Sequence, residues 1–130
     1  MELEYIADEL ESNQGYPLPL RETVSPDESI LDWRPMIETI VADFEHGTHP
    51  GVISARFHNA LAGGLLAVAT KCGHERVVLS GGCFQNRYLT ERCVSQLRDN
   101  GFRPYWHQRV PPNDGGIALG QVVAALRQKR

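Results

Sequence analysis

The sequence predicts an α/β fold in which a short parallel sheet is flanked by helices. The first observation is the run "RVVLS" (residues 76–80), which is short and almost uniformly apolar, as is typical of a buried central strand. An amphipathic segment over 86–100 and a second strand over 103–107 follow it. A final amphipathic segment, residues 116–130, closes the chain. This order predicts two parallel neighbouring strands with the first helix crossing between them.

Length and charge narrow the class of protein. At 130 residues the chain has room for one ordinary domain. We expect that domain to span residues 1–130, with a helix and an irregular arm over 1–32 and an α/β core over 33–130. The net charge of −3 argues against nucleic acid as the main partner, because phosphate binding needs a basic surface.

The cysteines, the apolar runs and the N-terminus predict the location of the protein in the cell. Cys72, Cys83 and Cys93 are odd in number and widely spaced, which fits a reducing compartment better than a disulfide framework. No uninterrupted apolar run approaches the roughly 20 residues that cross a bilayer. The acidic N-terminus is typical of neither a secretory signal nor a transit peptide. We therefore expect a cytoplasmic location and no membrane contact.

The first third of the chain predicts helices around an irregular arm. Residues 1–10 carry apolar side chains at helical spacing and predict a short acidic helix. The stretch 12–29 contains one glycine and three prolines, so it is expected to be an irregular loop or arm. Trp33 and Pro35 open a second helix that runs through Phe44 and ends in "EHGTHPG" (45–51).

Residues 50–73 predict the longest helix. Pro50 stands where a proline in the first turn is tolerated, and one apolar stripe follows it. Gly63 and Gly64 are each costly inside a helix, by about 1 kcal/mol relative to alanine. We therefore expect another backbone to lie close to this glycine pair. His58 lies beside the apolar stripe, where a histidine is most often a core or boundary residue.

The segment "SGGCFQN" (80–86) joins the apolar strand to the next helix. Helix N-termini carry free N–H groups and the positive end of the dipole, so this geometry can hold an anion. Gly81 and Gly82 would let a phosphate approach the backbone, and the Asn86 amide could bind a ribose or phosphate oxygen. The alternative is an ordinary tight turn in which Asn86 caps the helix. Cys83 is expected to be a small buried filler.

A second glycine-bearing loop, "PPNDGG" (111–116), precedes the last helix. Ligands of α/β layers collect at the carboxyl ends of parallel strands, where both loops would lie together. Asp114 is a carboxylate on a proline-stiffened loop, suited to a hard cation or a phosphate-bound metal. The alternative is that Asn113 or Asp114 caps the last helix. His46 and His49 could suit a metal by spacing, but no cysteine or carboxylate pair completes a site there.

Taken together, the two loops resemble a known family. "SGGCFQN" and "HQRVPPNDGGIALGQ", preceded in order by "MELE", "YPLPL", "DWRP" and "ISARFHNAL", resemble the C-terminal end of HypF, the carbamoyltransferases that mature NiFe hydrogenases. The resemblance covers nearly the whole chain. It implies the second lobe of a domain that is similar to the universal tRNA threonylcarbamoyl-transfer protein and has the actin and sugar-kinase (ASKHA) fold.

The resemblance also implies roles for individual residues. Four positions would contact nucleotide: Gly81, Gly82, Asn86 and Gly115. Asp114 would be a ligand of a divalent metal (zinc, iron or magnesium) whose histidines come from a first lobe that this sequence lacks. His58 would lie near the edge of the nucleotide cleft.

The implied reaction is carbamoyl transfer. HypF uses carbamoyl phosphate and ATP to make carbamoyl adenylate, then passes the carbamoyl group to the C-terminal cysteine of HypE, where it becomes the cyanide ligand of the hydrogenase. The implied partners are HypE and the first lobe, and the isolated lobe is expected to catalyse nothing. Two alternatives stay open: a non-catalytic lobe that binds nucleotide or serves assembly, and a tRNA threonylcarbamoyl-transferase-like protein. Phe84, Gln85 and the acidic net charge speak against the latter.

Overall fold

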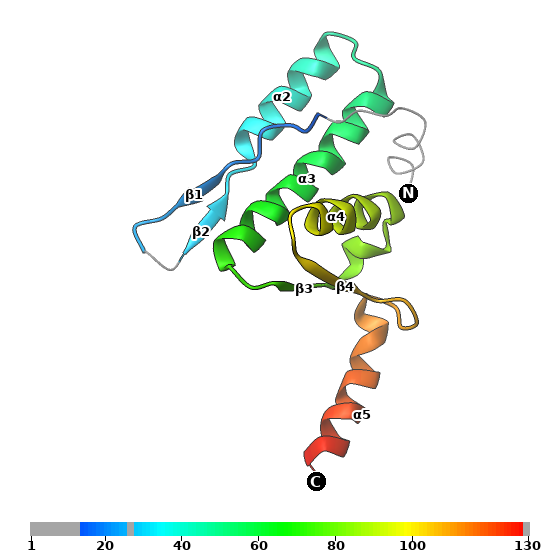
Figure 1. The fold of residues 1–130 in the computed structure, drawn as a ribbon. Coiled ribbons are helices and arrows are strands. Elements are labelled where there is room, and N and C mark those ends of the chain that lie inside the picture. Colours follow the sequence, from blue (N-terminus) through cyan, green and yellow to red (C-terminus); the bar gives the residue numbers. More distant parts are fainter. Residues whose placement is uncertain (1–13, 26–27, 129–130) are drawn as a thin grey trace.

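The computed structural model describes residues 14–25 and 28–128, so the helix predicted over 1–10 lies outside the described residues. Figure 1 shows the arrangement of the elements in space. They follow one another as β1 (Leu20–Glu22), β2 (Ser29–Leu31), α2 (Arg34–Glu45), α3 (Pro50–Cys72), β3 (Arg76–Leu79), α4 (Arg87–Asp99), β4 (Arg103–Trp106) and α5 (Ile117–Gln128). Short 3-10 turns at Gly82–Gln85 and Asp114–Gly116 precede α4 and α5.

The arm is not irregular throughout, and here the prediction is wrong. β1 and β2 form an antiparallel hairpin in which Leu20 lies opposite Leu31. Its prolines do not prevent pairing, because Pro19 precedes the first strand and needs no N–H. The Pro19 carbonyl instead accepts a 2.9 Å hydrogen bond from the backbone N–H of Asp32.

The three helices predicted over 33–44, 50–73 and 86–100 are confirmed as α2, α3 and α4. α3 begins at Pro50 and ends at Cys72, and its C-cap residue Gly73 adopts a left-handed φ of 68°. By length and composition alone α3 could cross a membrane, although the core helix of a compact protein passes the same test. Here α3 packs against α2 and α4, and nine of its residues are buried.

The expectation for Gly63 and Gly64 is also wrong. A Cβ on Gly63 would have nothing within 4 Å, and one on Gly64 would meet the side chain of Leu18 at 2.8 Å rather than a backbone. The close approach of two backbones occurs at Gly15, where a Cβ would lie 3.1 Å from the backbone nitrogen of Ala60. The Leu18 side chain of the arm therefore packs against α3 at Gly64. Where the backbones of the arm and α3 come closest, the glycine is Gly15 of the arm.

The parallel sheet is confirmed. β3 and β4 pair in parallel, from Arg76 opposite Arg103 to Leu79 opposite Trp106, and α4 crosses between them (Figure 1). One face of this sheet and the inner side of α4 pack on α3. The most deeply buried residues of this cluster are Ala62, Leu79, Leu89, Cys93, Val94 and Leu97.

β3 is not the buried central strand that its composition predicts. Among the described strands β3 pairs with β4 alone, which leaves its second edge open. Val78 and Tyr105 lie opposite each other and are 72% and 50% exposed, whereas Leu79 on the other face is 2% exposed. The described chain therefore covers one face of this sheet and leaves the other face in solvent.

Candidate functional site

The glycine loop turns sharply from β3 into α4. Gly81 has a φ of +103°, a conformation that residues with a side chain rarely adopt. Asn86 then caps α4, because its Oδ1 accepts a 2.7 Å hydrogen bond from the backbone N–H of Leu89. Among the described residues no acceptor is bonded to the backbone N–H groups of Gly82 and Cys83. The loop thus combines the cap of α4 with two unbonded backbone donors in the 3-10 turn that precedes this helix.

A cavity of about 640 Å³ lies where this loop meets α3. Its volume is in the range usual for small-molecule sites. Gly82 and Asn86 from the loop and His58 from α3 line it, so the structure brings three of the predicted residues together. The full lining consists of Phe57, His58, Leu61, Gly82, Cys83, Gln85, Asn86 and Leu89.

His58 is both a buried histidine and a neighbour of the loop. Its side chain is 3% exposed, and its ring packs edge-on against Tyr88 at 5.2 Å between centroids. Nδ1 lies 2.8 Å from the carbonyl oxygen of Ser54, and Nε2 lies 2.8 Å from Nδ2 of Asn86. The residue that the sequence suggests as a core histidine therefore contacts the predicted nucleotide-binding loop directly.

The second loop is bonded to the first. The backbone N–H of Gly81 donates a 2.9 Å hydrogen bond to the carbonyl oxygen of Pro112. Beside this bond, Oγ of Ser80 lies 2.9 Å from Nε2 of His107, which joins the carboxyl ends of β3 and β4. The sequence reasoning did not single out the Ser80–His107 pair, although each residue directly follows a strand of the parallel sheet.

Asp114 is not the cap of its helix turn. Oδ1 of Asn113 accepts a 3.0 Å hydrogen bond from the backbone N–H of Gly115, so Asn113 has that role. The Asp114 side chain is exposed and has no hydrogen bond or ion pair with any other residue the structure describes. The two loops lie together as predicted, but neither Asp114 nor Gly115 lines the cavity at Gly82. A Cβ on Gly116 would lie 2.9 Å from the Pro111 carbonyl, which explains that glycine by packing.

The described residues do not form a metal site by themselves. Within them, no three histidine, cysteine, aspartate or glutamate side chains gather in one place. His49 accepts a hydrogen bond from the backbone N–H of Gly51 through Nδ1, and Nδ1 of His46 lies 2.6 Å from the carbonyl oxygen of Ala42. Both histidines therefore serve helix ends. Asp114 offers one carboxylate, and the metal stays a prediction.

The cysteines differ from expectation at one position. Cys83 is exposed, because the 3-10 turn presents it to solvent, so its assignment as a buried filler is wrong. Cys93 is the buried thiol, and its burial, together with the nearby Cys83, raises its pKa to about 11. No disulfide links the described cysteines.

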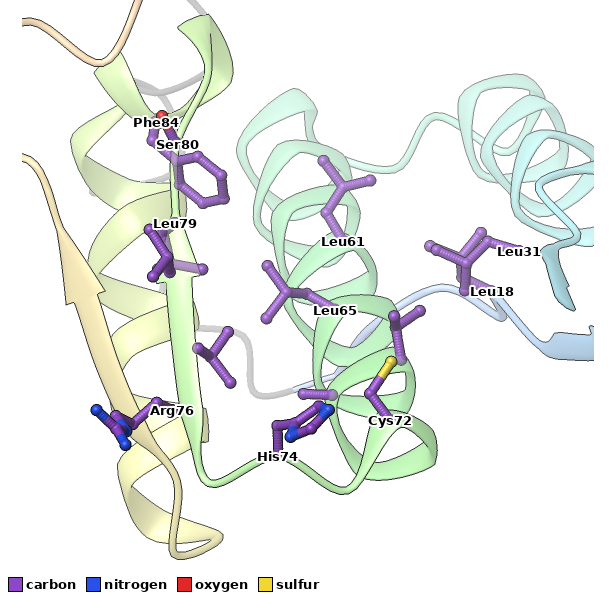
Figure 2. Close-up of a pocket in the computed structure, with 14 residues that line it drawn as sticks. Leu18, Leu31, Leu61, Leu65, Cys72, His74, Arg76, Leu79, Ser80 and Phe84 are labelled. Carbon is purple, nitrogen blue, oxygen red and sulfur yellow. The ribbon is translucent and has the colours of Figure 1, made fainter. Parts of the chain in front are cut away.

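A second cavity, of about 540 Å³, runs along the open edge of β3. Figure 2 shows Leu61 and Leu65 of α3 at its centre, with Leu79 of β3 on one side and Leu18 and Leu31 of the arm and hairpin on the other. This lining is mostly apolar, and its polar side chains lie at opposite ends, Ser80 at one and His74 and Arg76 at the other (Figure 2). It lacks the convergent polar groups that a nucleotide needs, so the first cavity is the candidate site.

Comparison with known families decides the identity of this fold. The family model described as "Carbamoyltransferase, Kae1-like Domain, second subdomain" matches residues 1–121. The chain belongs to this family. The carbamoyltransferase HypF of Synechocystis sp. is 37% identical over 119 residues, which are 92% of this chain and 15% of the relative. A HypF homolog of Cupriavidus necator is 34% identical over 107 residues, 78% of this chain and 27% of its own length.

Solved structures of HypF have the same fold. Full-length HypF in its phosphate- and nucleotide-bound form superposes with a TM-score of 0.82 at 37% identity, over 95% of this chain and 16% of that one. HypF of T. kodakarensis matches with a TM-score of 0.74 at 22% identity, which shows the fold alone. The predicted HypF membership and the predicted fold class are confirmed. The chain spans about 15% of the length of the Synechocystis relative.

Proposed function

We propose that this chain is the nucleotide-binding second lobe of a HypF-type carbamoyltransferase. The observation that carries the proposal is the cavity in which Gly82, Asn86 and His58 meet. Support comes from the similarity to a HypF that was crystallised with phosphate and nucleotide. The ligand would be ATP or carbamoyl adenylate, with its phosphates on the Gly81–Asn86 loop.

The chemistry of the loop suits a mixed anhydride. The free N–H groups of Gly82 and Cys83 and the N-terminus of α4 would stabilise negative charge on the phosphate side of carbamoyl adenylate. An external thiolate, which we propose to be the C-terminal cysteine of HypE, attacks the carbamoyl carbon, and AMP leaves with the bonding electrons. Cys93 is unsuited to act as nucleophile, because burial raises its pKa to about 11. The product would supply the hydrogenase cyanide ligand.

Asp114 would be the one ligand that this chain contributes to a divalent metal completed by the first lobe. The partners proposed are therefore that lobe and HypE. No nucleic acid or membrane partner is proposed, and the proposed location is the cytoplasm. An assembly role is the second candidate, because α5 exposes its apolar side chains and projects from the rest of the structure (Figure 1).

The loop is tested by filling the space at Gly82. A Cβ there has nothing within 4 Å and φ is not positive, so Gly82→Val should fold normally while obstructing phosphate. The host is the Synechocystis HypF carrying this chain in place of its matched region. Carbamoyl transfer from carbamoyl phosphate and ATP to a HypE peptide should fall by about 100-fold or more. Gly63→Val, also facing open space, is the matched control and should retain activity. Normal transfer by Gly82→Val would refute the proposal.

Asp114 is tested by Asp114→Asn in the same host. Because Asn113 supplies the cap, the fold should be unchanged. Carbamoyl transfer to the HypE thiol should be lost. The adenylate-forming step, measured by the release of pyrophosphate, should stay intact. A variant that transfers at the wild-type rate would exclude a metal-ligand role for Asp114.

A further inference from the structure

His58 stands in the middle of a chain of hydrogen bonds that begins and ends on backbone. The backbone N–H of Leu89 lies 2.7 Å from Oδ1 of Asn86. Nδ2 of Asn86 lies 2.8 Å from Nε2 of His58. Nδ1 of His58 lies 2.8 Å from the carbonyl oxygen of Ser54, one turn earlier in α3. This series of hydrogen bonds therefore runs from the first turn of α4 to the second turn of α3.

The two backbone ends fix every proton between them. A backbone N–H can only donate, so the Asn86 atom that faces Leu89 is the amide oxygen and the other is the NH₂ group. That NH₂ group donates to Nε2 of His58, which must then be unprotonated. The Ser54 carbonyl can only accept, so Nδ1 carries the proton. His58 is thus neutral and protonated on Nδ1.

We infer that His58 is the positioning residue for Asn86 in nucleotide binding, an inference that rests on the function proposed above. The Asn86 amide is held at its oxygen by Leu89 and at one N–H by His58, and Asn86 and His58 line the same cavity. The second N–H of the amide is the donor left for a ligand. The rings of Phe57 and Tyr88 pack edge-on against the imidazole and fix its plane. His58 acts through Asn86 and needs no contact with the nucleotide.

Two substitutions separate this role from simple core filling. Glutamine can place its amide oxygen near the position of Nε2, so His58→Gln keeps an acceptor for Asn86. Asparagine can place its amide nitrogen near the position of Nδ1, so His58→Asn keeps a donor for Ser54 and loses the acceptor. In the Synechocystis host, H58Q should hold the KM for ATP in carbamoyl transfer to the HypE peptide within about threefold of wild type, whereas H58N should raise it about tenfold or more. The KM for ATP in the adenylate-forming step, measured by pyrophosphate release, should not change in either variant. Equal KM values for the transfer reaction in two folded variants would overturn the inference.

A measurement on the unsubstituted chain keeps the inference falsifiable if the variants do not fold. Long-range ¹H–¹⁵N NMR should show His58 as the Nδ1-protonated tautomer, with a coupling across the hydrogen bond from Asn86 Nδ2 to His58 Nε2. A proton on Nε2 would overturn the inference, whatever the enzyme does. Conversely, a host that transfers carbamoyl normally with Gly82→Val would refute the proposed function while leaving this bond chain in place. The two failures are therefore distinguishable.

Discussion

Helices α4 and α5 have the same design and opposite surroundings. Each follows a glycine-bearing loop and a 3-10 turn, and an asparagine caps the turn or the helix. In α4 the inward residues Leu89, Cys93 and Leu97 are 6%, 1% and 0% exposed. In α5 the apolar residues Leu119, Val122, Val123 and Leu126 are between 40% and 62% exposed. Helical periodicity thus identifies which side of a helix is apolar, but not what covers that side.

The comparison should be clearest in the free energy of unfolding. Leu97→Ala removes a fully buried side chain from the contact between α4 and α3, and we expect it to cost about 2–5 kcal/mol. Leu126→Ala, on the exposed side of α5, should cost less than about 0.5 kcal/mol in the same chain. Urea unfolding followed by circular dichroism measures both. Similar losses would mean that α5 packs against something in solution.

The second largest difference should be in the stability lost when the asparagine caps, Asn86 and Asn113, are removed. Asn86→Ala removes the cap of α4 and leaves the buried Nε2 of His58 without a donor, so we expect a loss of about 2 kcal/mol. Asn113→Ala removes an exposed cap from a three-residue turn, and we expect a loss below about 1 kcal/mol. Thermal unfolding of the two variants, scanned at one protein concentration, checks the order. A larger loss at Asn113 would contradict the contrast between the two helices.

The thiol of Cys93 reports the packing of α4 with the smallest perturbation. Since burial raises its pKa from 9.0 to about 11, the folded state disfavours the thiolate. The stability that the protonated Cys93 thiol contributes should be fully present below about pH 9 and lost as the pH rises toward 11. At pH 8 a thiol reagent should label the exposed Cys72 and Cys83 quickly and Cys93 only after denaturant is added. Fast labelling of all three would show that α4 opens readily.

Much of the fold was predictable because its helices are long and periodic. The parallel pair was predictable as well, since a helix between two strands leaves few other topologies. The hairpin was missed because β1 and β2 have three residues each and follow a proline-rich stretch without alternation. The burial of β3 was overestimated because an apolar strand indicates that something covers it, and the described chain covers one face.

The candidate site was predictable down to its loops but not to its contacts. Parallel strands bring their carboxyl ends together, which predicted that Gly81 and the loop of Asp114 would be neighbours. Asn113 and Asp114 are equally good caps by type, so the choice between them needed the coordinates. The contact between His58 and Asn86 joins residues 28 positions apart, and no local pattern encodes it. The one sequence signal for this contact was the position of His58, a polar residue beside the apolar stripe of its helix.

The bond between Gly81 and Pro112 has a consequence for how such a site can change over evolution. Both bonded atoms belong to the backbone, so substituting residues along either loop leaves the donor and the acceptor in place. The side chains at Cys83 and Gln85 can therefore change, and ligand preference with them, while the two loops stay joined. Gly81 is the exception, since its φ of +103° is strained for any other residue although no atom crowds it. The residue type at position 81 is therefore constrained by a backbone dihedral angle and not by a side chain's contact with the ligand.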